Sequence, residues 1–413
     1  METAAPLVSD DTSIRFLLRL GRAMHDYGYS AEQLERGLAA MAGRLGLEAQ
    51  FFTTPTSILA AIGPLHGQRT FLIRTEPGTI DLGKLDELDD LQNEVLESKV
   101  TPSQGLARVE ALFARPGLYG PVARIVAAGA ASVSASVFLG GSGRDAAMSG
   151  VVGAIVGAAS VGIEPGRSSA RLFESAMACL AWLLASAIAI YFGPISQTNV
   201  ALSGLVALLP GLQLTLAMSE LATGHLASGN ARLMAAITVF VSLGIGVALG
   251  SRLSTLIFGA TPNLASQHLS EWAVFAVVPV AAIGFTIVFR ARPREFVPIV
   301  IAGGLALAGA AIGARWLGPD LGSFVGAFTA AVVSNIFARI RHQPAELTLV
   351  PAIVLLVPGS IGFSSLSSLL DRQVVPGVES AFRTVMISVA LTTGLLIADV
   401  LVPPRRGARG NVL

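Results

Sequence analysis

The feature that most constrains this chain is a stretch of 45 uncharged residues between Glu174 and Glu220. A helix that spans a lipid bilayer needs about 20 predominantly apolar residues. The stretch is therefore too long for one span and suits two, which we expect to join at Gly193–Pro194. No water-soluble fold needs such a run.

Apolar runs of similar length recur from Pro121 almost to the end of the chain. Only 13% of the residues are charged and the formal net charge is +1, which argues against an ordinary soluble enzyme and a nucleic-acid-binding protein. The expected partner of these apolar runs is the lipid bilayer. The runs predict ten transmembrane helices, at residues 121–140, 146–163, 173–192, 199–218, 231–250, 271–289, 297–314, 321–338, 347–366 and 382–402.

The charged residues are concentrated near the N-terminus, where the first 120 residues hold 16 acidic and 11 basic side chains. This part is expected to be a small α+β domain. Ser30 is positioned to cap a helix over 31–45 and Thr101 a helix over 102–113, and three short strands are expected between residues 49 and 75. We therefore divide the chain into a cytoplasmic domain, 1–115, and two five-helix transmembrane repeats, 116–255 and 256–413.

The arginines predict the orientation in the membrane. With the N-terminus inside, the inner segments carry fourteen arginines and the outer segments five. Positively charged residues favour the cytoplasmic side of a membrane. Both termini are therefore expected in the cytoplasm, and the expected location is the plasma membrane.

An internal repeat is indicated by two related segments, LLPG at 208–211 and LVPG at 356–359, 148 positions apart. The pairs Gly153/Gly157 and Gly309/Gly313 also recur at corresponding places, and GxxxG spacing lets two membrane helices approach closely. Because each half holds five spans, an odd number, the halves should cross the membrane in opposite senses, as in many secondary transporters.

The expected substrate site lies at the two proline-glycine breaks. Proline in a span removes a backbone hydrogen bond, and broken membrane helices are tolerated where they face protein or a water-filled cavity. Simple kinks without ligand contact are the alternative, as are hydroxyls that bond their own helix four residues back. The candidate substrate-binding residues are Pro210, Gly211, Gln213, Thr215, Ser219, Glu220, Thr223, Pro358, Gly359, Ser360 and Ser364.

Three titratable residues are candidates for proton coupling: Glu220, His225 and Asp399. Acidic groups inside membrane spans often mark proton or substrate paths. The alternative for Glu220 is an interfacial ion pair with Arg232, and the alternative for Asp399 is a residue that reaches the membrane surface. Asn199 and Asn335 are expected to join helices by hydrogen bonds.

The N-terminal domain offers a second, weaker hypothesis. His25 or His66 could activate Ser57 or Thr56, which would make this a membrane-anchored enzyme or a signalling protein with a partner-binding domain. No known nucleophile, metal-binding or cofactor motif accompanies these residues. The acidic run Asp86, Glu87, Asp89 and Asp90 is expected to be a solvated helix face, so neither metal nor cofactor is predicted.

The segment LLPGLQLTLAMSELATGHLASGNARL, residues 208–233, resembles the signature of the threonine/serine exporter family. LTLVPAIVLLVPGSIGFSSL, residues 347–366, is similar to the signature of that family's C-terminal half. The resemblance implies export of threonine, serine or a similar small amino acid, by alternating access and driven by the proton gradient. It leaves the oligomeric state open.

Overall fold

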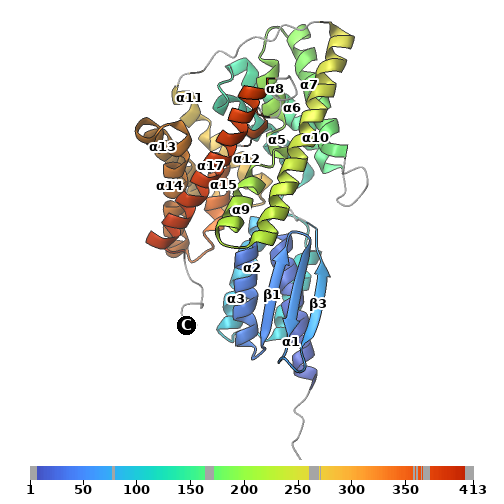
Figure 1. Ribbon diagram of the computed structural model, residues 1–413, viewed down its shortest axis with the longest axis vertical. Helices are drawn as coiled ribbons and strands as arrows, with labels where there is room; N and C mark the ends of the chain where they lie inside the picture. The colour runs from blue at the N-terminus through green and yellow to red at the C-terminus, as the bar shows by residue number, and fades with distance from the viewer. Residues whose placement is uncertain are drawn as a thin grey trace, which may run out of the picture.

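The computed structural model describes residues 7–76, 80–162, 172–259, 269, 271–356, 359, 361–363, 365 and 373–404, and the side chains from residue 11 onward. The chain is mostly helical. A small unit, residues 7–114, which we call the head, lies at one end of a larger helical body (Figure 1).

The head combines helices with the three expected strands, which pair in one antiparallel sheet in the order β1-β2-β3. Ser30 and Thr101 each form a capping box at the start of a helix, which satisfies first-turn amides that have no partner inside the helix. The elements are α1 (Leu7–Asp26), α2 (Ala31–Arg44), β1 (Ala49–Thr54), β2 (Ser57–Ile62), β3 (Arg69–Arg74), α3 (Leu82–Leu96) and α4 (Pro102–Ala114).

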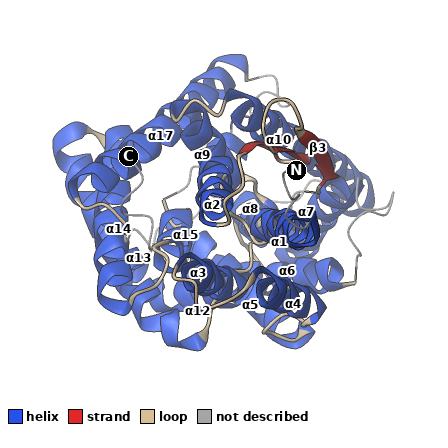
Figure 2. Cartoon of the chain, turned by 90° about the horizontal axis from the view of Figure 1, so that it is seen from below, coloured by secondary structure: helices blue, strands red, loops and turns tan. Residues whose placement is uncertain are grey.

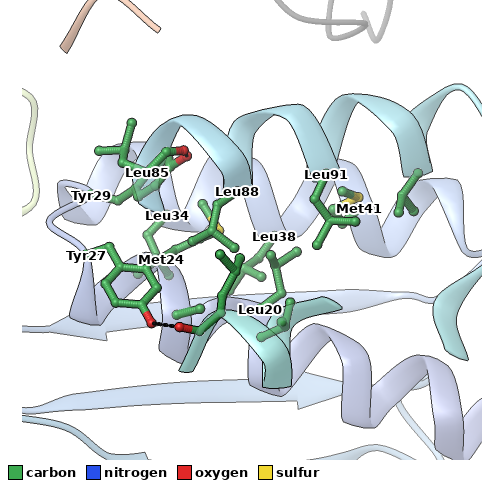
Figure 3. Close-up of a cluster of buried hydrophobic side chains, with 14 of the residues drawn as sticks. Leu20, Met24, Tyr27, Tyr29, Leu34, Leu38, Met41, Leu85, Leu88 and Leu91 are labelled. Atoms are coloured by element: carbon green, nitrogen blue, oxygen red, sulfur yellow. Dashed lines mark hydrogen bonds between the residues drawn. The ribbon is translucent and has the colours of Figure 1, made fainter. Parts of the chain in front are cut away.

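The core of the head lies between its helices, where leucine, methionine and tyrosine side chains interdigitate (Figure 3). The Tyr27 hydroxyl donates to the Leu112 carbonyl at 3.4 Å, which gives its buried polar tip a partner (Figure 3). The same apolar cluster continues into the helical body through Ala282, Ala291 and Leu347. The head is therefore packed onto the body, not joined to it by a linker alone.

The helical body consists of helices that overlap the predicted apolar runs. Those of the first half are α5 (Pro121–Phe138), α6 (Gly143–Val161), α7 (Phe173–Tyr191), α8 (Gln197–Gly204), η2 (Val206–Leu208), α9 (Gly211–Ala222) and α10 (Leu226–Phe258). Those of the second half are α11 (Glu271–Ala276), α12 (Val278–Val288), η3 (Pro293–Glu295), α13 (Phe296–Leu317), α14 (Pro319–Arg341), α15 (Glu346–Val354) and α17 (Val374–Leu401).

Within the described residues, six helices are long and apolar enough to cross a membrane: α5, α7, α10, α13 together with η3, α14 and α17. The bent pair formed by α8 and η2–α9 makes a seventh when it is taken as one span. α6, α11 with α12, and α15 overlap the other expected spans but are not among these helices, so the count of ten spans stays a prediction.

Glycines bring the helices of the body into close contact. A methyl group on Gly153 of α6 would lie 2.0 Å from Ser132 Oγ of α5, and one on Gly309 of α13 would lie 2.7 Å from Thr329 Oγ1 of α14. Both glycine pairs therefore mark close helix contacts, as predicted. However, the two pairs occur at corresponding sequence positions and contact helices that do not correspond, since α5 precedes α6 whereas α14 follows α13.

The two halves of the body are packed into each other. α9 of the first half contacts α17 of the second, and α12 packs against α5. In return, Phe363 of the second half is 1% exposed and belongs to the apolar cluster of the first half. Seen from the head side, α2 and α3 overlie the middle of the body, near α9 and α15 (Figure 2).

Candidate functional site

The predicted break at Pro210–Gly211 is present. α8 ends at Gly204, and the segment Val206–Ala222, which holds η2 and α9, runs at 47° to it; α9 itself begins at Gly211. Pro210 precedes α9 with φ −81° and ψ 34°, and no side chain caps the helix. The first amides of a helix have no acceptor within it. The break therefore frees backbone donors about halfway along a predicted membrane crossing.

Gly359 of the second motif lies close to the first break. A methyl group built on Gly359 would lie 3.5 Å from Gly211 Cα and 3.4 Å from Leu209 Cβ, so a side chain at position 359 would contact the first segment. Gly359 itself is buried. The structure thus brings the two glycines of the repeated motif together. Pro358, Ser360 and Ser364 lie outside the described residues.

The hydroxyls of α9 are mostly satisfied within their own helix. Thr215 Oγ1 donates to the Gly211 carbonyl at 3.3 Å, and Thr223 Oγ1 donates to the Ser219 carbonyl at 3.0 Å. These are the back-bonds that formed the alternative to a ligand-binding stripe. Ser219 is half-buried, whereas Gln213, in the first turn of α9, is exposed. Gln213 is therefore the polar side chain of α9 most open to a solute.

Glu220 is the centre of a buried network at the end of α9. Arg232 Nε lies 3.0 Å from each of its carboxylate oxygens, and Ser228 Oγ donates to Oε2 at 2.7 Å. The third donor is the backbone amide of Ala31 in the head, 3.1 Å from Oε1. The side chain is 2% exposed. Glu220 therefore forms the ion pair with Arg232, and it also joins the body to the head.

His225 follows in the loop between α9 and α10. Its Nε2 lies 3.5 Å from Glu35 Oε2 of α2, and its Nδ1 lies 3.3 Å from Thr223 Oγ1. Glu35 Oε1 in turn accepts hydrogen bonds from Thr53 of β1. This proton-coupling candidate thus contacts α2 of the head, as Glu220 does. We call this contact region between the head and the body the seam.

The head contacts the second half through an arginine-rich loop, residues 290–294. Asp86 of α3 accepts from Arg292 at 2.7 Å and from Arg294 at 2.9 Å, and Glu87 accepts from Arg292 at 2.9 Å. Asp86 is only 2% exposed. The expectation of a solvated acidic face is therefore wrong for Asp86, since the run meets a basic loop that lies more than 200 residues away.

Burial sets the protonation of Asp86. It raises the pKa of this carboxyl to about 6, although the charge of Arg292 acts in the opposite direction. Beside it, the amides of Leu82 and Gly83 donate to the carbonyls of Phe289 and Arg290 at 2.9 and 3.1 Å. The start of α3 is thus fixed to the end of α12 by backbone as well as by charge.

The remaining polar candidates lie at opposite ends of the body. Asp399, an exposed residue near the end of α17, accepts from Asn335 Nδ2 at 2.8 Å, and Asn335 also donates to the Val402 carbonyl. Asn199 of α8 bonds Ser136 and the Leu139 carbonyl of α5. Both asparagines therefore join neighbouring helices, as predicted.

The enzyme hypothesis finds little geometric support in the head. The Ser57 hydroxyl lies 2.9 Å from Thr54 Oγ1 at the start of β2, while His66 lies beyond the other end of that strand. His25 Nε2 lies 3.3 Å from Thr75 Oγ1. Across the described part of the chain, no three acidic, histidine or cysteine side chains are grouped to hold a metal ion.

Sequence reasoning missed the head–body contacts. Gln33 Nε2 donates to Glu346 at the start of α15, and neither residue was a candidate. For the α3 contact a signal was available, because an acidic run in a predicted helix and the basic loop at 290–294 have complementary charge. The contacts of Gln33 and Glu35 have no such signal, since they involve single residues on an ordinary amphipathic helix.

Comparison with known proteins gives two family matches. One threonine/serine exporter family matches residues 15–254, and a second, described as "Threonine/Serine exporter", matches residues 274–401. Together they cover the head and both halves of the body. No solved structure matches the chain.

Among curated proteins, the chain is similar to the fungal "Pheromone-regulated membrane protein 10". It is 24% identical over 410 residues to the protein of Eremothecium gossypii, covering 94% of this chain and 54% of that protein. The identity to the Yarrowia lipolytica protein is 26% over 368 residues, or 84% and 30% of the two chains. The chain thus spans about half or less of these relatives.

The first of the two family matches covers more than half of the chain and includes the broken span, the Glu220 network and the head that contacts it. The chain belongs to the threonine/serine exporter family of membrane proteins.

Proposed function

We propose that this protein is a secondary transporter that exports threonine, serine or a similar small amino acid from the cytoplasm by alternating access. Its ten spans would form two five-helix repeats of opposite orientation in the plasma membrane, with both termini in the cytoplasm. The observation that carries the proposal is the contact between the two breaks, Gly211 with Gly359. Family membership supports the direction and class of solute.

The contact matters because a broken helix presents backbone groups that a straight one uses internally. The start of α9 offers free amides and a positive dipole end, which favour a carboxylate. Free carbonyls at a helix end favour an ammonium group. Two breaks that lie side by side can therefore offer backbone groups to both ends of one amino acid.

The proposed site lies between the halves, where alternating access requires it. α9 packs on α17 of the second half, and Phe363, four residues after Gly359, packs into the first. A relative movement of the halves would then open the site to one side or the other. The proposed lining is completed by Gln213 and Ser219.

Proton coupling is assigned to the three titratable candidates. The donor to Asp399 is the neutral amide of Asn335, so this carboxyl can take up a proton without breaking an ion pair with that partner. Glu220 is held by Arg232, so its protonation would need that ion pair to open. We therefore place the coupling step first at Asp399, with His225 and Glu220 acting at the seam with the head.

The test is efflux of radiolabelled threonine from proteoliposomes, with and without an imposed pH gradient, compared with a panel of other amino acids. We expect efflux that accelerates with the gradient and is competed by serine. Gln213→Leu should reduce it, and Thr238→Val, which alters an exposed hydroxyl of α10, should not. The absence of amino-acid movement under either condition would contradict the proposal.

A further inference from the structure

The head is attached to the two halves of the body in different ways. Toward the second half it shares one apolar cluster, to which Leu82, Leu85 and Leu88 of α3 contribute together with Ile299 and Leu347. The described members of this cluster include no residue of the helices α5 to α10. Backbone hydrogen bonds from Leu82 and Gly83 and the arginine loop strengthen the same attachment.

Toward the first half, the contacts of α2 are polar. The amide of Ala31 donates to Glu220 at 3.1 Å, and Glu35 lies 3.5 Å from His225. Both partners flank the turn from α9 to α10, at the end of the broken span. Separating polar contacts of this kind costs less free energy than separating a packed apolar surface, because water can replace each hydrogen bond.

From this asymmetry we infer that the head is a cytoplasmic gate: it moves with the second half, and the first turn of α2 latches onto Glu220 and His225 of the first half when the inner side is closed. The inference rests on the proposed function, since it gives the head a role in alternating access. It assigns the head an activity of its own, which is to control entry from the cytoplasm.

The latch is built from groups that the helix leaves available. Ala31 is the first residue of α2, so its amide has no acceptor inside the helix, and Glu220 supplies one. Gln33 has a double role: its Oε1 accepts from the Ser30 amide at 3.2 Å and its Nε2 donates to Glu346 of the second half. The same turn is therefore fixed on one side and latched on the other.

The position of Ala31 allows a selective test. Proline at the first position of a helix is well tolerated, because the amide that it lacks is not used there. The preceding Ser30 has φ −68° and ψ 160°, the extended conformation that a following proline requires. Ala31→Pro should thus delete the hydrogen bond to Glu220 and leave α2 intact. Ala31→Gly, which keeps the amide, is the matched control.

The measurement is access to the interior of the protein from the head side. Cys179 is the single cysteine of the chain, so a Cys179→Ala background with Thr215→Cys gives one reactive thiol on α9, at a position that is 2% exposed. The rate of labelling by a membrane-impermeant maleimide is followed in vesicles that have the head outside. A shift in thermal unfolding midpoint would reveal any general loss of structure.

We expect Ala31→Pro to raise the labelling rate roughly tenfold, corresponding to about 1.4 kcal/mol, and Ala31→Gly to leave it unchanged. His225→Ala, a second variant that acts on the other latch contact, should raise it as well. Equal labelling in the Ala31→Pro, His225→Ala and parent proteins would overturn the gate. Since labelling needs no transport, a change in labelling together with no threonine efflux by the wild-type protein would contradict the proposed function and not the latch.

Discussion

Gly211 and Gly359 come from segments 148 residues apart and lie against each other: a methyl group on Gly359 would be 3.5 Å from Gly211 Cα. Each glycine follows a proline in a repeated motif. Because neither has a side chain, the two backbones can approach to a distance at which one small solute could contact both. The Pro-Gly pairs are in this view required by a shared site and not only by local bending.

Because of the network around it, truncating the Glu220 side chain should lower the stability of the folded protein strongly. Glu220→Ala leaves the buried Ser228 hydroxyl and Ala31 amide and the partly buried Arg232 guanidinium without their acceptor. Removing one partner of a buried ion pair costs about 3–5 kcal/mol. We therefore expect a clearly lower thermal unfolding midpoint in detergent. Arg252→Ala, at an exposed residue of α10, is the control and should change little.

Close helix packing predicts that one added methyl group is harmful at Gly153 and harmless at Gly304. At Gly153 the methyl would lie 2.0 Å from Ser132 Oγ, so α5 and α6 must separate, whereas nothing lies within 4 Å of the corresponding position at Gly304. Overpacking of this kind costs typically about 1–3 kcal/mol. Thermal unfolding of Gly153→Ala and Gly304→Ala checks this, and equal midpoints would contradict the packing of α6 on α5.

Asp86 predicts a pH-dependent stability of the head–body contact. Its pKa is about 6 in the folded protein, against 3.8 for an ordinary aspartate, so between these values the folded state binds more protons than the unfolded state. Stability from this group is thus full below pH 4 and is lost as the pH rises through 6.

The shift corresponds to roughly 3 kcal/mol at most, at about 1.4 kcal/mol per pKa unit. Asp86→Asn should flatten the pH dependence of the unfolding midpoint between pH 4 and 6. Glu48→Gln, at an exposed residue of the head, should retain the wild-type slope. A slope of opposite sign in the wild type would show that the ion pairs with Arg292 and Arg294 outweigh burial.

Proton coupling at Asp399 predicts a specific loss. Asp399→Asn should retain exchange of threonine across the membrane and lose the acceleration by a pH gradient, because the amide cannot take up the proton. Asp320→Asn, at an aspartate of α14 paired with Arg383, is the matched control and should keep the acceleration. Undiminished acceleration in Asp399→Asn would move the coupling site to His225 or Glu220.

Local sequence signals predict many of the secondary-structure elements. Helix caps such as Ser30 and Thr101 and the alternating strands of the head act over a few residues, so pattern and propensity suffice to predict them. The same holds for the start of α9 directly after Pro210, since proline is disfavoured inside a helix; the end of α8 at Gly204, six residues earlier, has no such local signal. The meeting of Gly211 with Gly359 followed from the repeat, because related segments are expected to pack around one axis.

The seam between head and body could not be predicted in the same way. The partner of Glu220 in the head is a backbone amide, which any residue at position 31 would offer except proline. Thr215 and Thr223 were expected to point toward a ligand, and their bonds to Gly211 and Ser219 depend on side-chain rotamers that the sequence leaves open. The partner of Glu220 and the hydrogen bonds of the two threonines both depend on how the elements pack in three dimensions.

The most direct test of the shared site is threonine efflux from proteoliposomes that carry substitutions at Gly359. A single methyl group there makes only ordinary contacts, so Gly359→Ala should transport at a reduced but measurable rate. Gly359→Val should place a larger side chain between the two segments and lower efflux at least roughly tenfold. A tenfold loss of rate corresponds to about 1.4 kcal/mol in the activation free energy. Gly304→Val, on open space in α13, should transport as the wild type does. Equal efflux in Gly359→Val and Gly304→Val would contradict a substrate site between the two breaks.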